Sequence, residues 1–175
     1  AVVLMESQDK YRLGEILEYL DARYPKRFDD FDYWNARGHH EWWQGRPDEA
    51  RKIFVYALNG DVKDDERMML MTKTAELYVE MNKPKKAIRA LDAMITLHDE
   101  LGKPLNGQAR RDARWRTAEI NYQESFWPDA VASLTTFIRE YPDDSERFEA
   151  RLLNGRALVA LGDEDGAKRQ WDILK

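Results

Sequence analysis

The sequence of 175 residues contains no cysteine. Disulfides, thiol nucleophiles and thiolate metal sites are therefore excluded. The chain also lacks a run of about 20 apolar residues, the length that a helix needs to cross a membrane. Its β-branched residues never alternate with polar ones over a useful length, so no strand is predicted. What remains is a helical chain whose function cannot rest on sulfur chemistry.

Charged residues are abundant, at 35% of the sequence, and hydrophobic residues make up 43%. This balance is typical of helical proteins whose core is formed by apolar stripes. The 33 acidic residues outnumber the 28 basic ones, which gives a net charge of −5. An acidic surface disfavours non-specific binding to nucleic acid, so we expect no nucleic-acid partner.

Four short turns, each lying between two amphipathic stretches, organise the chain. Each turn begins seven residues after a small residue, and its last residue, an alanine, lies twelve residues after that small residue. The small residues are Gly38, Ala75, Ala118 and Gly155, and the alanines are Ala50, Ala87, Ala130 and Ala167. Gly, Asn or Ser at the end of one helix and Pro near the start of the next are typical of a tight helical hairpin.

Large apolar residues follow the alanines in the same register. Four positions after each alanine stand Phe54, Leu91, Leu134 and Trp171. A spacing of four residues places these side chains and the alanines on one face of the helix. We therefore predict that each small residue faces the helix that follows it, where the absence of bulk lets two helices approach closely.

This repeated pattern resembles the tetratricopeptide repeat (TPR) family, which repeats a helix–turn–helix unit about every 34 residues. The first copy carries the resemblance in Trp34, Gly38, Ala50, Phe54 and Ala57, and the fourth in Gly155, Leu158, Gly162, Ala167 and Trp171. Arg114 and Arg151 depart from it, because they stand where the family has an aromatic or apolar residue. The resemblance implies an all-α fold, a right-handed α-solenoid of TPR-like repeats.

The register divides the chain into hairpins with predicted boundaries. We expect a partial repeat at 1–27 and repeats at about 31–62, 68–101, 108–142 and 145–175. The predicted helices are 9–23, 29–44, 47–59, 64–81, 84–101, 107–124, 128–141, 145–161 and 164–175, and Asp143 with Glu146 is expected to form a capping box at the eighth helix. Apolar faces near both ends favour a fragment of a longer array, since solenoids need polar caps; burial of these faces in a dimer is the alternative.

In the TPR family, the first helix of each hairpin lines a concave groove that binds extended peptides. The resemblance therefore implies that a partner groove contains Asn35, His39, Trp42, Glu76, Trp115, Glu119, Tyr122 and Arg156. The aromatic rings among them suit a peptide with aromatic or basic side chains, or a sugar whose apolar faces stack on Trp. Packing of the same rings against the neighbouring hairpin is the alternative, and Trp43 is expected in the core.

Three arginines, Arg110, Arg111 and Arg114, lie on neighbouring faces near the start of one predicted helix. Cations at a helix N-terminus are unfavourable by a few tenths of a kcal/mol each. The cluster is therefore unexpected on local grounds, which suggests a docking site for an acidic partner; a solvated helix surface is the alternative.

Catalytic motifs are absent from the sequence. It contains no phosphate-binding glycine loop and no Gly-x-Ser-x-Gly. His39 and His40 are adjacent and point about 100° apart on a helix, so they cannot easily close on one metal ion. We expect no enzyme activity, no cofactor and no metal.

Together these features predict a scaffold that binds another protein or peptide within a larger assembly. The alternative is a periplasmic TPR module that binds or exports exopolysaccharide, because the segment from Phe137 to Leu158 resembles repeats of the bacterial cell envelope. We expect a periplasmic location, with the cytoplasm as the alternative. Self-association through the open ends is a third possibility.

Overall fold

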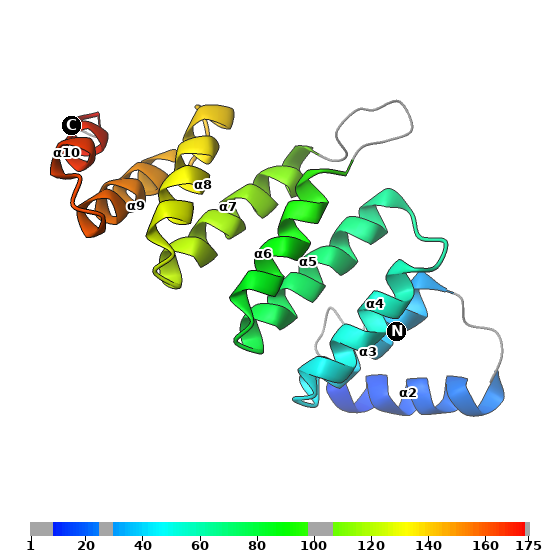
Figure 1. Ribbon diagram of the computed structural model, residues 1–175. Coiled ribbons are helices and arrows are strands. Elements are labelled where there is room, and N and C mark those ends of the chain that lie inside the picture. The colour runs from blue at the N-terminus through cyan, green and yellow to red at the C-terminus, as the bar shows by residue number, and fades with distance from the viewer. Residues whose placement is uncertain (1–8, 25–29, 98–106, 174–175) are drawn as a thin grey trace. The chain divides into compact units, whose positions relative to one another are not determined.

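The computed structural model describes residues 9–24, 30–97 and 107–173, and Figure 1 shows them as helices joined by short turns. No strand occurs in these ranges, so the predicted all-α class is confirmed. Contacts divide the chain into two compact units, Ala1–Ala90 and Leu91–Lys175. Helix α6 (Pro84–Ile95) begins in the first unit and ends in the second.

In the first unit, each helix packs against the next one along the chain. Helix α2 (Lys10–Arg23) contacts α3 (Phe31–Trp43), α3 contacts α4 (Pro47–Leu58), and α4 contacts α5 (Asp64–Glu80). Two apolar clusters hold these helices together. One contains Leu13, Leu17 and Ala36, and the other contains Ala50, Phe54, Ala57, Leu70 and Leu77. Trp43, which was expected in the core, packs on the first cluster and is partly buried.

The second unit follows the same plan. Helix α7 (Gly107–Gln123) contacts α8 (Trp127–Glu140), α8 contacts α9 (Arg147–Ala160), and α9 contacts α10 (Glu164–Asp172). One cluster of fully buried side chains links α7, α8 and α9. Its members are Ala118, Ala130, Leu134, Phe137, Ala150 and Ala157.

Small residues face the helix that follows them, as the register predicts. A Cβ atom placed on Gly38 would lie 2.1 Å from the Phe54 ring, and one on Gly155 would lie 2.2 Å from the Trp171 ring. Either distance is far below van der Waals contact, so only a residue without a side chain fits. Ala118 and Leu134 occupy the equivalent positions in one buried cluster. The packing rule inferred from the spacing is therefore confirmed at these hairpins.

Four turns have a left-handed residue at the predicted first position. Its φ is 72° at Gly45, 55° at Asn82, 60° at Ser125 and 83° at Gly162. In each turn the next residue donates its N–H to the carbonyl five residues before it, at 2.8–3.0 Å; the donors are Arg46, Lys83, Phe126 and Asp163. This is the hydrogen bond of a Schellman motif, which satisfies a carbonyl at the helix end. Asn82 and Ser125 adopt a conformation that disfavours most side chains.

Acidic side chains cap the starts of α3, α5 and α10. Asp30 accepts a hydrogen bond from the N–H of Asp32 at 3.1 Å, and Asp163 accepts one from the N–H of Gly166 at 2.8 Å. At the start of α5, Glu66 accepts from the N–H of Lys63 at 2.8 Å. These contacts satisfy N–H groups that have no partner within the helix.

Two details differ from the prediction. Helix α6 ends at Ile95 and not near residue 101. The predicted capping box is also wrong. Helix α9 begins at Arg147, and Asp144, rather than Asp143, accepts a hydrogen bond from the N–H of Glu146 at 3.0 Å.

Candidate functional site

In the first unit, a mixed aromatic and charged surface joins α3 to α5. We call it the α3–α5 face and define it by His39 and Trp42 of α3 and Lys73, Glu76 and Glu80 of α5. The indole N–H of Trp42 donates to the Glu80 carboxylate. The Lys73 ammonium lies 5.7 Å from the centre of the Trp42 ring. These contacts bring residues more than thirty positions apart in the sequence onto one surface.

Lys73 is held between an aromatic ring and a carboxylate. Its ammonium lies 3.0 Å from a carboxylate oxygen of Glu76, and its side chain is 30% exposed. A cation over a half-exposed ring contributes about 0.5–1 kcal/mol. Trp42 also packs on the cluster that contains Phe54, so its ring is half-buried. The ring is therefore fixed in place while part of it remains open to a ligand.

His39 is held in one tautomer. Its Nδ1 lies 2.9 Å from the carbonyl oxygen of Asn35, and because a carbonyl only accepts, Nδ1 must carry the proton. Its ring centre lies 5.5 Å from that of Phe54 and 6.1 Å from that of Trp42. Burial lowers the pKa of His39 below its usual range, and the nearby Lys73 lowers it further. At neutral pH the imidazole is uncharged.

Asn35 lies deeper than the other residues of the predicted groove. It is 5% exposed, and its amide nitrogen points to the sulfur of Met69 at 3.9 Å. Its place is therefore between α3 and α5, below the surface that carries Trp42 and Glu76. A ligand on that surface would contact Asn35 only after a rearrangement of α3 and α5.

In the second unit, the predicted groove residues of α7 are half-buried. The ring centre of Trp115 lies 5.1 Å from that of Phe137, and that of Tyr122 lies 5.5 Å from that of Trp127. Both Trp115 and Tyr122 pack on the cluster shared by α7, α8 and α9. Each ring therefore packs against the core on one side and keeps part of its surface exposed. This arrangement combines the two alternatives weighed from the sequence, ligand binding and packing against the neighbouring helices.

Helix α9 presents an exposed strip, which we call the α9 strip. Phe148, Leu152 and Val159 are 57%, 37% and 46% exposed, and the predicted groove residue Arg156 is also exposed. Spacings of four, four and three residues place all four side chains on one side of the helix. The strip offers apolar contact around a single cation.

The remaining predicted groove residue of the second unit, Glu119 of α7, is paired with Arg116 at 3.2 Å.

The arginine cluster at the start of α7 is largely engaged within the chain. Arg111 donates hydrogen bonds to the carboxylates of Asp144 and Glu146, and its side chain is 12% exposed. This hydrogen bonding holds the pKa of Asp144 well below its usual range. Arg114 lies 3.2 Å from a carboxylate oxygen of Glu140. These contacts tie α7 to the end of α8 and the start of α9. Among the described residues, Arg110 forms no ion pair with a carboxylate.

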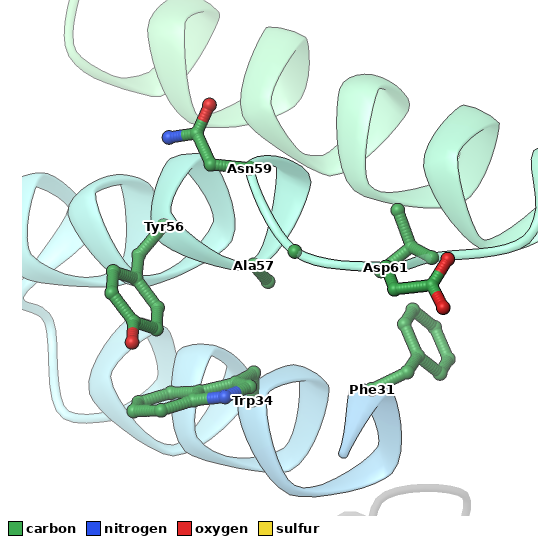
Figure 2. A pocket seen from close by; sticks show the side chains of 8 residues that line it. Phe31, Trp34, Tyr56, Ala57, Asn59 and Asp61 are labelled. Carbon is green, nitrogen blue, oxygen red and sulfur yellow. The ribbon is translucent and has the colours of Figure 1, made fainter. Parts of the chain in front are cut away.

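A pocket that sequence analysis missed opens in the first unit between α3, α4 and the loop before α5. Its volume is about 310 Å³, and Figure 2 shows Trp34 and Tyr56 on one side of it with Phe31 and Asp61 on the other. From the sequence, Trp34 was identified only as a residue of the repeat pattern. The pocket could not be found from periodicity, because Asp61 comes from a loop.

Within the described ranges, no group of three or more His, Asp and Glu side chains is arranged to hold a metal ion. No helix among the described residues is both long and apolar enough to cross a bilayer.

No protein-family model and no curated protein matches this sequence. Several solved structures resemble it across most of its length. Repeats of a putative kinesin light chain from Podosopora anserina, described as nearly identical and TPR-like, give a TM-score of 0.69 at 12% identity and cover 95% of this chain and 83% of that one. YrrB, described as a TPR protein with an unusual peptide-binding site, gives 0.66 at 15% identity, covering 97% of this chain and 78% of YrrB.

PilF of Pseudomonas aeruginosa gives a TM-score of 0.64 at 17% identity and covers 97% of this chain and 69% of PilF. Identities this low establish the fold alone. They confirm the predicted architecture, an all-helical solenoid of TPR-like hairpins, and the resemblance on which that prediction depended.

Proposed function

We propose that this chain, whose fold is that of the tetratricopeptide-repeat proteins, is a non-enzymatic scaffold that binds a partner protein or peptide within a larger assembly. The binding surfaces in this proposal are formed by the first helices of the hairpins. One is the α3–α5 face of the first unit, and another, in the second unit, comprises Trp115, Glu119 and Tyr122 with the α9 strip.

One observation carries the proposal: the half-exposed Trp42 ring is fixed by contacts from the next first helix. Glu80 accepts its N–H, and Lys73 lies over the ring at 5.7 Å. A rigid aromatic side chain loses little conformational entropy when a partner packs against it, and Trp is enriched among the residues that dominate binding energy. This arrangement is suited to anchoring a ligand.

The charges of the surface suggest which ligand it prefers. On the α3–α5 face, Glu80 accepts the indole N–H of Trp42 and Glu76 pairs with Lys73. Two carboxylates therefore face one ammonium, so a peptide with a basic or aromatic side chain is complementary. On the α9 strip, Arg156 lies among apolar side chains, which favours an acidic residue flanked by apolar ones. YrrB, which has this fold, is described as having a peptide-binding site, and that supports a peptide as the ligand class here.

A peptide-display selection on the intact chain tests the proposal. Selected peptides are then measured against Trp42→Ala and Trp115→Ala by isothermal titration. Loss of an anchoring aromatic ring typically costs 2 kcal/mol or more, so we expect about 30-fold weaker binding with helical content unchanged. Lys52→Ala is the matched control, because Lys52 is 54% exposed on α4, outside the proposed surface.

Two results of these measurements would contradict the proposal. If Trp42→Ala and Trp115→Ala lose helical content and melting temperature together, both rings act as core residues, and the proposal fails. Equal weakening by Lys52→Ala would show that the peptides bind elsewhere.

A second candidate is the binding of a polysaccharide by the same rings. The half-exposed Trp42, hydrogen-bonded to a carboxylate, favours it, because sugar rings present apolar faces that stack on indole and hydroxyls that pair with carboxylates. Titration of tryptophan fluorescence with cationic and neutral oligosaccharides tests this function. An unchanged spectrum throughout would exclude it.

The proposal also includes the cellular location of the scaffold. We place it in the bacterial periplasm as part of an envelope assembly, with the cytoplasm as the alternative, and cell fractionation distinguishes the two. Self-association is a separate expectation, which sedimentation at increasing protein concentration checks.

A further inference from the structure

The pocket in the first unit is lined mainly by aromatic rings. The ring centres of Trp34 and Tyr56 lie 4.8 Å apart at an interplanar angle of 61°, so two aromatic walls meet at an angle. Phe31 supplies a third ring across the space (Figure 2). Buried Ala57, which is 4% exposed, lies between them. Three aromatic side chains therefore line one space, and two of them are in edge contact with each other.

The loop that completes the pocket is held by its own hydrogen bonds. The N–H of Gly60 donates to the carbonyl of Ala57 at 3.0 Å, and that of Val62 donates to the carbonyl of Gly60 at 3.1 Å. The amide of Asn59 donates to the carbonyl of Val55 at 3.1 Å. Asp61 is therefore carried by an ordered turn, and a ligand need not organise the loop when it binds.

The charge of the described pocket lining is negative. Among the described lining residues, Asp61 is the only ionisable group other than the Tyr56 phenol. Acidic side chains also flank the lining in sequence, at Asp30, Asp32 and Asp64. Two basic residues are close in sequence: Lys63 directly follows the lining, and Arg67 directs its guanidinium to the carbonyl of Leu58 at 3.4 Å. The acidic side chains named above outnumber them. The local field therefore favours a cation and opposes an anion.

We propose that this pocket binds an organic ammonium headgroup, with Phe31, Trp34 and Tyr56 as the aromatic walls and Asp61 as the counter-ion. Aromatic cages of this composition suit methylated ammonium groups, because such cations keep their charge while presenting an apolar surface to the rings. A volume of about 310 Å³ lies at the lower end of small-ligand sites. The site is separate from the peptide surface proposed above and does not depend on it.

Choline and its neutral isostere 3,3-dimethylbutanol provide the test, with isothermal titration and amide chemical shifts of the full chain as readouts. We expect choline to bind and to shift the amides of residues 31–34 and 56–62. The isostere should bind at least tenfold more weakly, because it has the same shape without the charge. Equal binding of the two compounds, or no binding of choline, would overturn the proposal.

Two variants identify the residues responsible. Tyr56→Leu removes a ring that is 56% exposed, and its fold is expected to survive because the side chain carries little of the core; choline binding should weaken about fivefold. Asp61→Asn should weaken it about threefold, whereas Asp64→Asn, the same charge change outside the lining, should have less effect. If Asp64→Asn weakens binding as much as Asp61→Asn, the acidic residues act only through their overall field, and the assignment of Asp61 is wrong.

The source of the headgroup is distinguished by a glycine-flanked trimethyl-lysine peptide. Tighter binding of this peptide than of choline assigns the pocket to a side chain of a partner protein, and the reverse assigns it to a free small molecule. Both results support an ammonium site. Peptides selected on the α3–α5 face should bind Tyr56→Leu as they bind the unmodified chain, so the two proposals can fail separately.

Discussion

Gly38→Ala tests the packing rule on which the fold depends. The added Cβ would lie 2.1, 2.6 and 2.7 Å from three atoms of the Phe54 ring, and Phe54 is completely buried. Overpacking of a dense core costs about 1–3 kcal/mol, and a ring without free space places this case near the upper end. Alanine returns about 1 kcal/mol through its better helix propensity. We expect a net loss of about 2 kcal/mol in the free energy of unfolding.

Urea titration followed by far-ultraviolet circular dichroism measures this loss, and two other glycines act as controls. At Gly155 the added Cβ would meet the Trp171 ring, which is only half-buried and can shift, so Gly155→Ala should cost less. At Gly107 no atom lies within 4 Å of an added Cβ, so Gly107→Ala should be neutral or slightly stabilising. A Gly38→Ala variant as stable as Gly107→Ala would refute the close approach of α3 and α4.

Three further predictions concern charge and turns. Hydrogen bonding to Arg111 lowers the pKa of Asp144, so the ionised carboxylate stabilises the fold at pH values above about 4, the usual pKa of an aspartate. The free energy of unfolding should therefore fall as the pH drops below that value. Asp144→Asn should cost about 2 kcal/mol at neutral pH and flatten this pH dependence in urea titrations. Burial lowers the pKa of His39, so the uncharged imidazole stabilises the fold above about pH 6.5, and the free energy of unfolding should decrease as the pH falls below that value. His39→Gln should remove this pH dependence. Ser125→Gly should raise the free energy of unfolding by about 0.5–1 kcal/mol, because the φ of Ser125 is 60°; thermal melts check the sign, and a lower melting temperature would contradict it.

The hairpins could be predicted from the sequence because their packing is local. Gly38 and Phe54, or Gly155 and Trp171, lie in one hairpin, so a fixed spacing between a small and a large residue is enough to pair them. The left-handed turn positions follow from the same register. The end of α6 at Ile95 could not be predicted, because no Gly or Pro lies directly after it to mark a helix end.

The sites were less predictable, because their partners are distant or lie in loops. Glu80, which accepts the N–H of Trp42, was not predicted, although Glu76 on the same helix was. The arginine cluster suggested a docking site, yet Asp144 and Glu146, more than thirty residues away, engage Arg111. The aromatic pocket depends on where the loop places Asp61, and no periodic pattern encodes that position.

Sixteen residues separate each glycine from the ring that fills the space beside it. Closing so short a stretch of chain costs little entropy, and proteins dominated by near-neighbour contacts fold quickly. A newly synthesised hairpin can therefore settle against its own partner before the rest of the chain exists. By the same reasoning, damage at Gly38 should spread mainly to adjacent hairpins, since repeats interact chiefly with their immediate neighbours.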